Sequence, residues 1–325
     1  MNGSARLAVD IGGTFTDVVL EHAGGQDSLK LLTTPAAPER AVLEGIGEIL
    51  KRTGVAASDV ALVIHGTTLA TNALIERKGA HTALVTTDGF RDSIEIAYEH
   101  RFEQYDLYME RPEPLVSREH RFTVPERLAA DGSVLLELDE AAVRALVPTL
   151  RGGKFDAIAI CFLHSYANDD HEIRARDILA AALPGVSITI SSDVCPEIRE
   201  YDRMSTACAN AYVQPMMAGY LARLQDSLRT DGLDCPLLLM MSSGGVTTVE
   251  TAIAKPIRLV ESGPAGGAIL ARDIARENDL KRALSFDMGG TTAKITLIDD
   301  FTPHIARSFE VARMYRYLKG SGLPL

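Results

Sequence analysis

An acidic, glycine-rich motif occurs twice in this sequence, and its residue types suit the binding of a phosphorylated ligand. Both copies read Asp-x-Gly-Gly-Thr, over residues 10–14 and 287–291. Glycine permits a tight turn and leaves no Cβ in the way of a ligand. Successive backbone N–H groups and threonine hydroxyls can donate hydrogen bonds to an anion. Because a carboxylate at the end of a strand repels phosphate directly, we expect each aspartate to hold Mg²⁺, through water.

Each copy of the motif is flanked by two apolar runs, a pattern that predicts a β-hairpin. Residues 7–9 and 18–20 flank the first copy, and residues 284–286 and 295–298 flank the second. One such turn is weak evidence for a ligand site. Two of them indicate a nucleotide held between two related hairpins.

The bulk composition is that of a globular protein with a large core. The chain has 325 residues, of which 46% are hydrophobic and 24% charged, and this length predicts about two domains. The net charge of −11 argues against non-specific binding to nucleic acid, which needs a basic surface. We therefore expect no nucleic-acid partner.

The cysteine pattern and the apolar runs bear on the cellular compartment. The four cysteines are widely spaced and form no Cys-x-x-Cys pair, so a zinc or disulfide framework is not expected, which suits a reducing cytoplasm. The N-terminus has no basic segment followed by a long apolar one, and no apolar run approaches membrane-spanning length. We expect a cytoplasmic protein without a membrane partner.

The order of the elements predicts an α/β fold with a mixed sheet. Three N-terminal strands precede an alternation of helix and strand, which continues after residues 88–135. We place a domain boundary near residue 191, which gives a first domain over residues 1–190 and a second over residues 191–325. The expected helices lie at residues 38–51, 69–78, 139–150 and 169–183, and the expected strands at residues 28–32, 60–64, 82–86, 157–163 and 186–190.

Residues 88–135 are predicted to form an insertion packed over one end of the sheet. Their first part, residues 88–127, is rich in aromatic, charged and proline residues. Such a segment could supply a substrate-facing lid or a surface for a partner. A solvated, irregular excursion is the commoner outcome.

The stretch His65-Gly66-Thr67-Thr68 lies where a strand passes into a helix, a favoured place for ligand contacts. In one interpretation it is a substrate or phosphate loop. In the other, Thr67 or Thr68 caps the helix, and His65 is a buried group whose hydrogen bonds are satisfied. The sequence alone leaves both open.

Beyond residue 191 the predicted elements do not complete a domain. A helix is expected over residues 205–228, in two pieces interrupted near Pro215, and then a buried strand over residues 236–241 that residues 246–248 extend. Residues 261–268 open a helix whose small residues we assign to close packing. After the second hairpin the sheet lacks further strands and covering helices. This imbalance predicts a fragment of a longer polypeptide.

The paired motifs, with a small-residue helix just before the second, resemble the actin, sugar-kinase and Hsp70 superfamily of nucleotide-binding domains. More narrowly, the chain resembles the hydantoinase A/oxoprolinase family. That family includes ATP-dependent hydantoinases, 5-oxoprolinases and caprolactamases, and the ATP-binding subunits of acetone and acetophenone carboxylases. The matching segments are residues 9–17, 65–68, 71–74, 197–201, 210–215, 262–266 and 287–291.

The resemblance implies a ribonuclease-H-like α/β fold. The first mixed-sheet domain would be followed from residue 191 by an incomplete second domain of the same type, with an ATP cleft between them. Residues 10–16 and 287–292 would be the two phosphate loops, and the helix from Pro264 the connecting hinge. ATP and Mg²⁺ are the implied cofactors. The implied partner is a hydantoinase B-type subunit or domain, in an oligomeric protein.

The candidate site residues receive roles on this basis. Asp10 and Asp287 would hold Mg²⁺ on the β- and γ-phosphates and are the catalytic candidates together with His65. Lys294 stands where many relatives have a second acid, so it could neutralise phosphate but not hold Mg²⁺. Thr67 and Thr68 are candidates for the substrate side. Phosphate oxygens would be bound by Gly12, Gly13, Thr14, Thr16, Gly289, Gly290, Thr291 and Thr292.

The expected reaction is the ATP-dependent ring opening of a cyclic amide or imide. Phosphorylation turns the carbonyl oxygen into a leaving group, and the protein contributes positioning and charge neutralisation. The alternative of an ATP-dependent ketone carboxylase shares every motif described here. In that reaction the ketone would be activated as an enol phosphate. The remaining alternatives are a sugar or small-acid kinase and a non-catalytic ATP-binding switch. The sequence does not identify the ring or the ketone.

Overall fold

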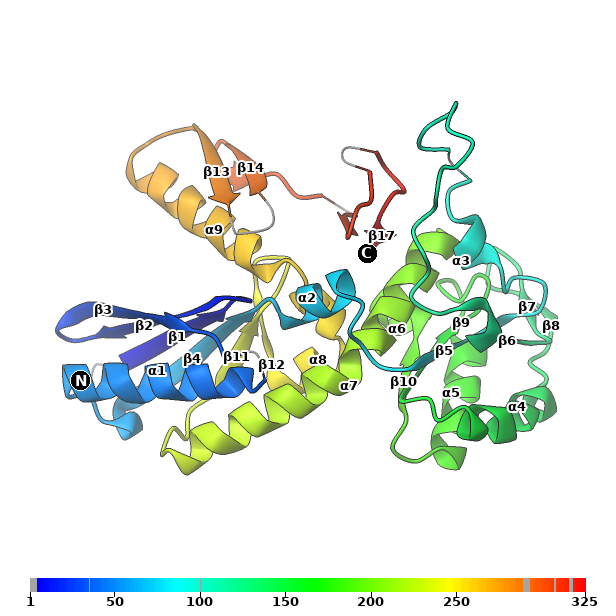
Figure 1. Cartoon of the computed structure of the whole chain (residues 1–325), viewed down its shortest axis with the longest axis horizontal. Helices are drawn as coiled ribbons and strands as arrows, with labels where there is room; N and C mark the ends of the chain where they lie inside the picture. The colour runs from blue at the N-terminus through cyan, green and yellow to red at the C-terminus, as the bar shows by residue number, and fades with distance from the viewer. Residues whose placement is uncertain (1–4, 35, 100, 289–292, 307, 316–317) are drawn as a thin grey trace. The chain divides into compact units, whose positions relative to one another are not determined.

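The computed structural model describes residues 5–34, 36–99, 101–288, 293–306, 308–315 and 318–325. Within it the chain forms two compact units, each built from two stretches of sequence. Unit 1 comprises Met1–Asn72 and Met217–Arg307, and unit 2 comprises Ala73–Met216 and Ser308–Leu325. Helices and strands occur in both units (Figure 1), so the predicted α/β class is confirmed.

Unit 1 is organised around a six-stranded mixed sheet with the order β12-β11-β4-β1-β2-β3. Three antiparallel strands form the predicted N-terminal meander, and β4 and β11 continue the sheet parallel to β1. The strands are β1 (Ala5–Ile11), β2 (Phe15–His22), β3 (Gly25–Leu32), β4 (Val60–Thr67), β11 (Leu237–Met240) and β12 (Val246–Thr248). Strand β11 comes after residue 191 in the sequence, yet it lies in the same sheet as the N-terminal strands. The domain boundary near residue 191 stays a prediction.

Helix α1 (Pro38–Thr53) covers one face of this sheet (Figure 1). Its apolar residues recur every three or four positions, and Val42, Ile46 and Ile49 are buried. Val18 of β2 meets this helix, and Val9 is its cross-strand partner on β1. Since side chains alternate along a strand, Asp10 is left on the opposite face of the sheet.

The rest of unit 1 carries the second hairpin. Helix α9 (Ser262–Glu277) packs on a small antiparallel sheet of β13 (Arg282–Met288), β14 (Ala293–Asp299) and β15 (Thr302–Pro303). Before it come α8 (Val249–Ala254) and the 3-10 turn η3 (Pro256–Leu259). Apolar side chains on one face of the small sheet are 51–71% exposed, and these are Leu284, Phe286, Met288, Ile295 and Leu297.

Unit 2 is a parallel sheet with helices on both faces. The order is β10-β9-β5-β6, with β5 (Thr82–Thr87), β6 (Arg121–Val124), β9 (Ala157–Cys161) and β10 (Ser187–Ile190). Helices α4 (Glu140–Gly152) and α5 (Asp170–Ala182) contribute to one core, and the first half of α7 (Glu200–Thr230) contributes to the other. Both faces of β9 are buried, which explains its continuous apolar sequence.

Short elements complete the described chain. In unit 1 these are η1 (Ala57–Asp59) and α2 (Leu69–Ile75), which continues toward unit 2. In unit 2 they are α3 (Ser93–Ile96), η2 (Arg118–His120), β7 (Arg127–Leu128), β8 (Val134–Leu136), α6 (Ser191–Val194), β16 (Glu310–Val311) and β17 (Leu323–Pro324). Among the helices that the structure describes, none combines the length and the apolar character that a bilayer crossing requires.

Helix α7 corrects a prediction. It runs unbroken for 31 residues through Pro215, where the sequence predicts an interruption. A proline inside a helix removes one backbone hydrogen bond. Here the flanking turns are fully buried at Ala211, Val213 and Met217, and this packing keeps the helix continuous.

Three smaller differences have local causes. Helix α2 ends at Ile75 rather than at residue 78, because Arg77 adopts a φ of 56°. Residues 246–248 return antiparallel to β11 instead of extending it, through a turn at Gly244 with a φ of 84°. The predicted insertion at residues 88–135 contributes β6 to the parallel sheet, so part of it is integral to unit 2.

Candidate functional site

Asp10 is positioned by three neighbouring strands of the unit 1 sheet. It lies opposite Asp17 on β2 and beside Gly66 on β4. Glycine is required at position 66, because a Cβ there would lie 2.7 Å from the Oδ1 atom of Asp10. Burial by surrounding atoms raises the pKa of Asp10, and the charges of Asp17 and Asp287 raise it further, while Lys30 opposes them.

Asp287 lies near the end of β13 in the same unit, and its charge acts on Asp10. In the second hairpin it lies opposite Lys294, as Asp10 lies opposite Asp17 in the first. The two hairpins therefore share one register, and position 294 carries a cation where position 17 carries an acid. The predicted phosphate contacts Gly289, Gly290, Thr291 and Thr292 lie outside the described residues.

The turn of the first hairpin offers fewer phosphate donors than the sequence predicts. The N–H of Gly12 donates to the carbonyl of Phe15 at 2.9 Å and closes the turn, so it is not available to a phosphate. Thr33 holds the same turn, because its hydroxyl donates to the carbonyl of Gly12 at 2.9 Å. Gly13 and Thr14 are exposed, and within the described residues their N–H groups have no backbone acceptor.

Thr16, which the sequence predicts to contact phosphate, has a hydrogen-bond partner within the turn. Its side chain is fully buried, and its hydroxyl meets that of Thr33 at 3.0 Å. Since the single hydroxyl proton of Thr33 goes to Gly12, Thr16 is the donor in this bond. Thr16 therefore fixes the turn through Thr33, and Thr14 is the motif's exposed hydroxyl.

His65 is a buried group whose hydrogen bonds are satisfied. It is 1% exposed, its Nδ1 atom donates to the carbonyl of Val9 at 3.2 Å, and its Nε2 atom accepts from the hydroxyl of Tyr220 at 2.7 Å. Burial lowers the pKa of His65 to about 4, so its ring is neutral at neutral pH. Of the two interpretations of this stretch, the geometry of His65 fits the structural one, because both ring nitrogens have hydrogen-bond partners inside the protein.

Thr67 and Thr68 build the junction between β4 and α2. Thr67 is 2% exposed, and its hydroxyl oxygen accepts the N–H of Leu69 at 3.2 Å. Thr68 donates to the carbonyl of Ile11 through its N–H at 3.0 Å and its hydroxyl at 3.2 Å. The bonds of Thr68 tie the start of α2 to the end of β1, beside the first turn. Both threonine hydroxyls therefore take part in local hydrogen bonds of the junction.

Lys294 forms an ion pair with Glu261, the residue that precedes α9. Burial lowers the pKa of Lys294. The backbone of Glu261 has a φ of 67°, uncommon for a residue other than glycine. The small residues of 261–268 predict close packing, and Glu261 is not among the predicted site residues. Its signal in the sequence is an acid directly before a small-residue helix.

The residues around Asp10 fit a magnesium-bound phosphate. The raised pKa of Asp10 reflects its burial first and then the charges of two other carboxylates, whose repulsion a divalent cation would relieve. In nucleotide sites Mg²⁺ takes one or two carboxylates together with phosphate oxygens and water. Gly13 and Thr14 supply exposed donors in the adjoining turn. The part of the chain that the structure describes holds no group of three or more His, Cys, Asp or Glu side chains that could bind a metal.

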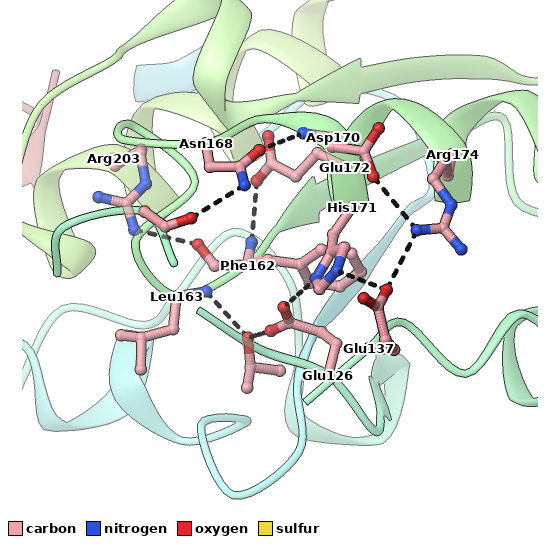
Figure 2. A network of polar contacts seen from close by, with 12 residues as sticks. Glu126, Glu137, Phe162, Leu163, Asn168, Asp170, His171, Glu172, Arg174 and Arg203 are labelled. Carbon is pink, nitrogen blue, oxygen red and sulfur yellow. Dashed lines mark hydrogen bonds and ion pairs between the residues drawn. The ribbon is translucent and has the colours of Figure 1, made fainter. Parts of the chain in front are cut away.

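A second polar cluster lies in unit 2, near the carboxyl ends of its parallel strands (Figure 2). Glu172 accepts from the N–H of Phe162 at 2.8 Å and from the hydroxyl of Ser191 at 2.6 Å. His171 donates to Glu126 at 2.8 Å. These side chains are all buried, and their hydrogen bonds join the strand ends to α5. The cluster therefore has a structural role in unit 2.

Comparison with known proteins decides the family. The sequence model described as the hydantoinase/oxoprolinase N-terminal region matches residues 6–183, and the one described as hydantoinase/oxoprolinase matches residues 203–319. The chain belongs to the hydantoinase/oxoprolinase family. The resemblance inferred from the sequence motifs is therefore confirmed.

Two curated relatives and one solved structure show what this hydantoinase/oxoprolinase family member is similar to. It is 36% identical to caprolactamase subunit alpha of Pseudomonas jessenii, over 90% of this chain and 43% of that protein. It is 30% identical to the acetophenone carboxylase gamma subunit of Aromatoleum aromaticum, over 90% of this chain and 42% of that protein. The crystal structure of the ATP-dependent caprolactamase from Pseudomonas jessenii matches with a TM-score of 0.82 and 36% identity, over 90% of this chain and 43% of that one. The chain spans about half the length of the curated relatives it matches.

Proposed function

We propose that this family member is the ATP-binding part of an enzyme that opens a cyclic amide or imide, of hydantoin, oxoproline or lactam type. The observation that carries the proposal is the charge interaction of Asp10 with Asp287 within one compact unit. These two residues begin the two Asp-x-Gly-Gly-Thr motifs, which lie far apart in the sequence. Their proximity supports a single phosphate site built from both hairpins.

In this proposal Asp10 and Asp287 hold Mg²⁺, which supplies charge neutralisation and orients the phosphoryl group. From the first hairpin, Gly13 and Thr14 donate to phosphate oxygens, while Gly12 and Thr16 hold the turn. Each charge-assisted hydrogen bond contributes about 1.5–3 kcal/mol, so several are needed to position a polyanion. The donors proposed from the second hairpin are Gly289, Gly290, Thr291 and Thr292.

The chemistry follows from the poor reactivity of an amide carbonyl. The carbonyl oxygen attacks the terminal phosphorus of ATP, the bond to ADP breaks, and an imidate phosphate forms. Water then adds to the same carbon, and the ring C–N bond breaks with the nitrogen taking up a proton. Hydrolysis of the remaining acyl phosphate releases the ring-opened acid and phosphate. The protein contributes positioning and charge neutralisation to the phosphoryl transfer.

The strand order supports a ribonuclease-H-like assignment for the sheet that carries Asp10. In the run β3-β2-β1-β4-β11 only β2 runs against the direction of the others. We propose that the small sheet of β13, β14 and β15 begins a second domain of the same type. The division of these domains at residue 191 remains part of the proposal.

The proposal also includes a partner subunit of the hydantoinase B type, an oligomeric assembly and a cytoplasmic location. The partner subunit is supported by the names of two relatives, the caprolactamase alpha subunit and the acetophenone carboxylase gamma subunit. The cytoplasmic location accords with the four free cysteines.

The test is product analysis of the protein assembled with its partner subunit, supplied with ATP and cyclic amides, with and without bicarbonate. Ring-opened acid and phosphate formed without bicarbonate are the expected products. Turnover only of a ketone, and only with bicarbonate, would favour the alternative of a ketone carboxylase, which the similarity to the acetophenone carboxylase subunit supports. ATP turnover that no such substrate stimulates would contradict both and leave a non-catalytic switch.

A further inference from the structure

Glu261 contacts elements that lead to both hairpins of unit 1. Its N–H donates to the hydroxyl oxygen of Thr71 at 3.3 Å, and Thr71 lies on α2, which Thr68 ties to the end of β1. Its side chain pairs with Lys294 on β14. One residue therefore connects the strand that carries Asp10 with the hairpin that carries Asp287.

The conformation and burial of Glu261 carry a cost that packing alone does not explain. A φ of 67° in a residue other than glycine is a strained backbone conformation. The side chain is only 19% exposed, and its Oε2 atom is buried and meets Lys294 alone among the described residues. Backbone strain and buried charge in one residue are concentrated at functional sites.

Lys294 is less exposed than Lys30, the lysine on β3 that pairs with Asp17 of the first hairpin. Lys30 and Asp17 form an ion pair at 2.7 Å with side chains 56% and 45% exposed, whereas those of Lys294 and Glu261 are 32% and 19% exposed. A less hydrated ammonium attracts a phosphate more strongly. Lys294 also stands opposite Asp287 in the hairpin register.

We propose that Lys294 contacts the terminal phosphate of the bound nucleotide and that Glu261 is the positioning residue that holds it there. This inference rests on the proposed function. Lysine has three N–H donors, so Lys294 can bind Glu261 with one and a phosphate oxygen with another. Only a triphosphate gains the second contact. The pair therefore gives the site a preference for ATP over ADP.

The test is calorimetric titration of the full chain with MgATP and with MgADP. Lys294→Met is expected to weaken ATP binding about 10-fold or more, the equivalent of one charge-assisted hydrogen bond, and to leave ADP binding little changed. Glu261→Gln is expected to weaken ATP binding less. It should add nothing in the Lys294→Met background, because the two residues act as one unit.

The controls separate this role from a merely structural one. Glu39→Gln is a matched control variant, because Glu39 is 13% exposed and forms an ion pair with Arg223 at 2.8 Å. Glu39 lies on α1, which covers the face of the sheet opposite to Asp10. The preference of this variant for ATP over ADP should equal that of the wild type. Lys294→Arg keeps the charge and should retain the preference, even if Lys294→Met destabilises the fold. The inference is overturned if Lys294→Met leaves the ratio of the affinities for ATP and ADP unchanged. It is also overturned if Glu261→Gln binds ATP more tightly than the wild type does. A wild-type chain that binds neither nucleotide overturns the proposed function itself, and this inference with it.

Discussion

Burial and the neighbouring carboxylates make the ionised form of Asp10 costly for the folded protein, and they make the residue suitable for a metal. Because its pKa is raised in the folded state, the ionised form is less favourable there than in the unfolded chain. At neutral pH, Asp10→Asn is therefore expected to raise the melting temperature of the nucleotide-free protein while it abolishes magnesium-dependent nucleotide binding. Thermal unfolding and titration with and without Mg²⁺ measure the two effects. Magnesium dependence that survives the substitution would remove Asp10 from the metal site.

Nucleotide binding is expected to depend on Gly66 as well as on Asp10, which lies beside it in the sheet. In Gly66→Ala the new Cβ would lie 2.7 Å from Oδ1 of Asp10, which displaces the carboxylate and lowers the free energy of unfolding by about 1–3 kcal/mol. Nucleotide affinity should fall with it. Gly47→Ala is the control, since a Cβ there meets nothing within 4 Å and should stabilise α1 by about 0.5–1 kcal/mol. Equal behaviour of the two variants would contradict the close approach of Asp10.

His65 should give the stability curve a slope in acid. Burial lowers its pKa from 6.5 to about 4, so between these pH values the unfolded chain binds a proton that the folded chain excludes. The stability that neutral His65 contributes is complete above about pH 6.5 and is lost as the pH falls to about 4, by roughly 3 kcal/mol. Urea unfolding at a series of pH values should show this loss in the wild type and a flatter curve in His65→Gln. Parallel curves would mean that His65 is not desolvated in the folded state.

For single residues, the sequence shows which groups could bind phosphate. It does not show which of these groups form hydrogen bonds within the protein instead. The hydroxyl of Thr16 and the N–H of Gly12 match the motif, yet one donates to Thr33 and the other to Phe15. These partners depend on the hairpin register and on a residue outside the motif. Among the described residues no such bond occupies the hydroxyl of Thr14, which stays a predicted phosphate donor.

The helices and strands that form from local sequence patterns could be predicted, whereas the pairing of strands distant in sequence could not. The hairpin at Asp10 and helix α1 could be predicted, since glycine turns and apolar periodicity act within a few residues. The places of β6 and β11 could not, because each pairs with strands distant in sequence. Such pairing is decided by packing and not by local propensity.

Pro215 provides a test of this explanation for α7. If burial of the flanking turns is what keeps the helix continuous, Pro215→Ala restores a backbone hydrogen bond without disturbing the packing. The free energy of unfolding should then rise by about 1–3 kcal/mol, as measured by denaturant unfolding. A fall would show instead that the surrounding core is shaped to the proline. Pro148, inside α4, offers the same substitution in a shorter helix for comparison.

For the whole molecule, the exposed apolar face of β13 and β14 predicts its behaviour in solution. Phe286 and Leu297 are 57% and 51% exposed on this face, and contiguous apolar patches promote association. The isolated chain should self-associate as its concentration rises, and Phe286→Thr with Leu297→Thr should increase the monomer fraction. Sedimentation velocity over a range of concentrations measures this. A wild-type chain that stays monomeric throughout would contradict the expectation.

The family could be recognised from the sequence because its motifs are short, local and repeated. The substrate could not, because the residues that would distinguish a lactam from a ketone are not marked by any motif. The chain also spans about half of the curated relatives it matches. Recognition of phosphate and choice of substrate are therefore separate questions, and the two Asp-x-Gly-Gly-Thr motifs bear only on the first.

The central claim is that the two Asp-x-Gly-Gly-Thr hairpins bind one magnesium-loaded nucleotide between them. The most direct measurement is a crystal structure of the chain with Mg²⁺ and a non-hydrolysable ATP analogue. The account predicts metal density between the carboxylates of Asp10 and Asp287, with phosphate oxygens at the N–H groups of Gly13 and Thr14. A nucleotide bound away from both aspartates, or bound by one hairpin alone, would contradict it.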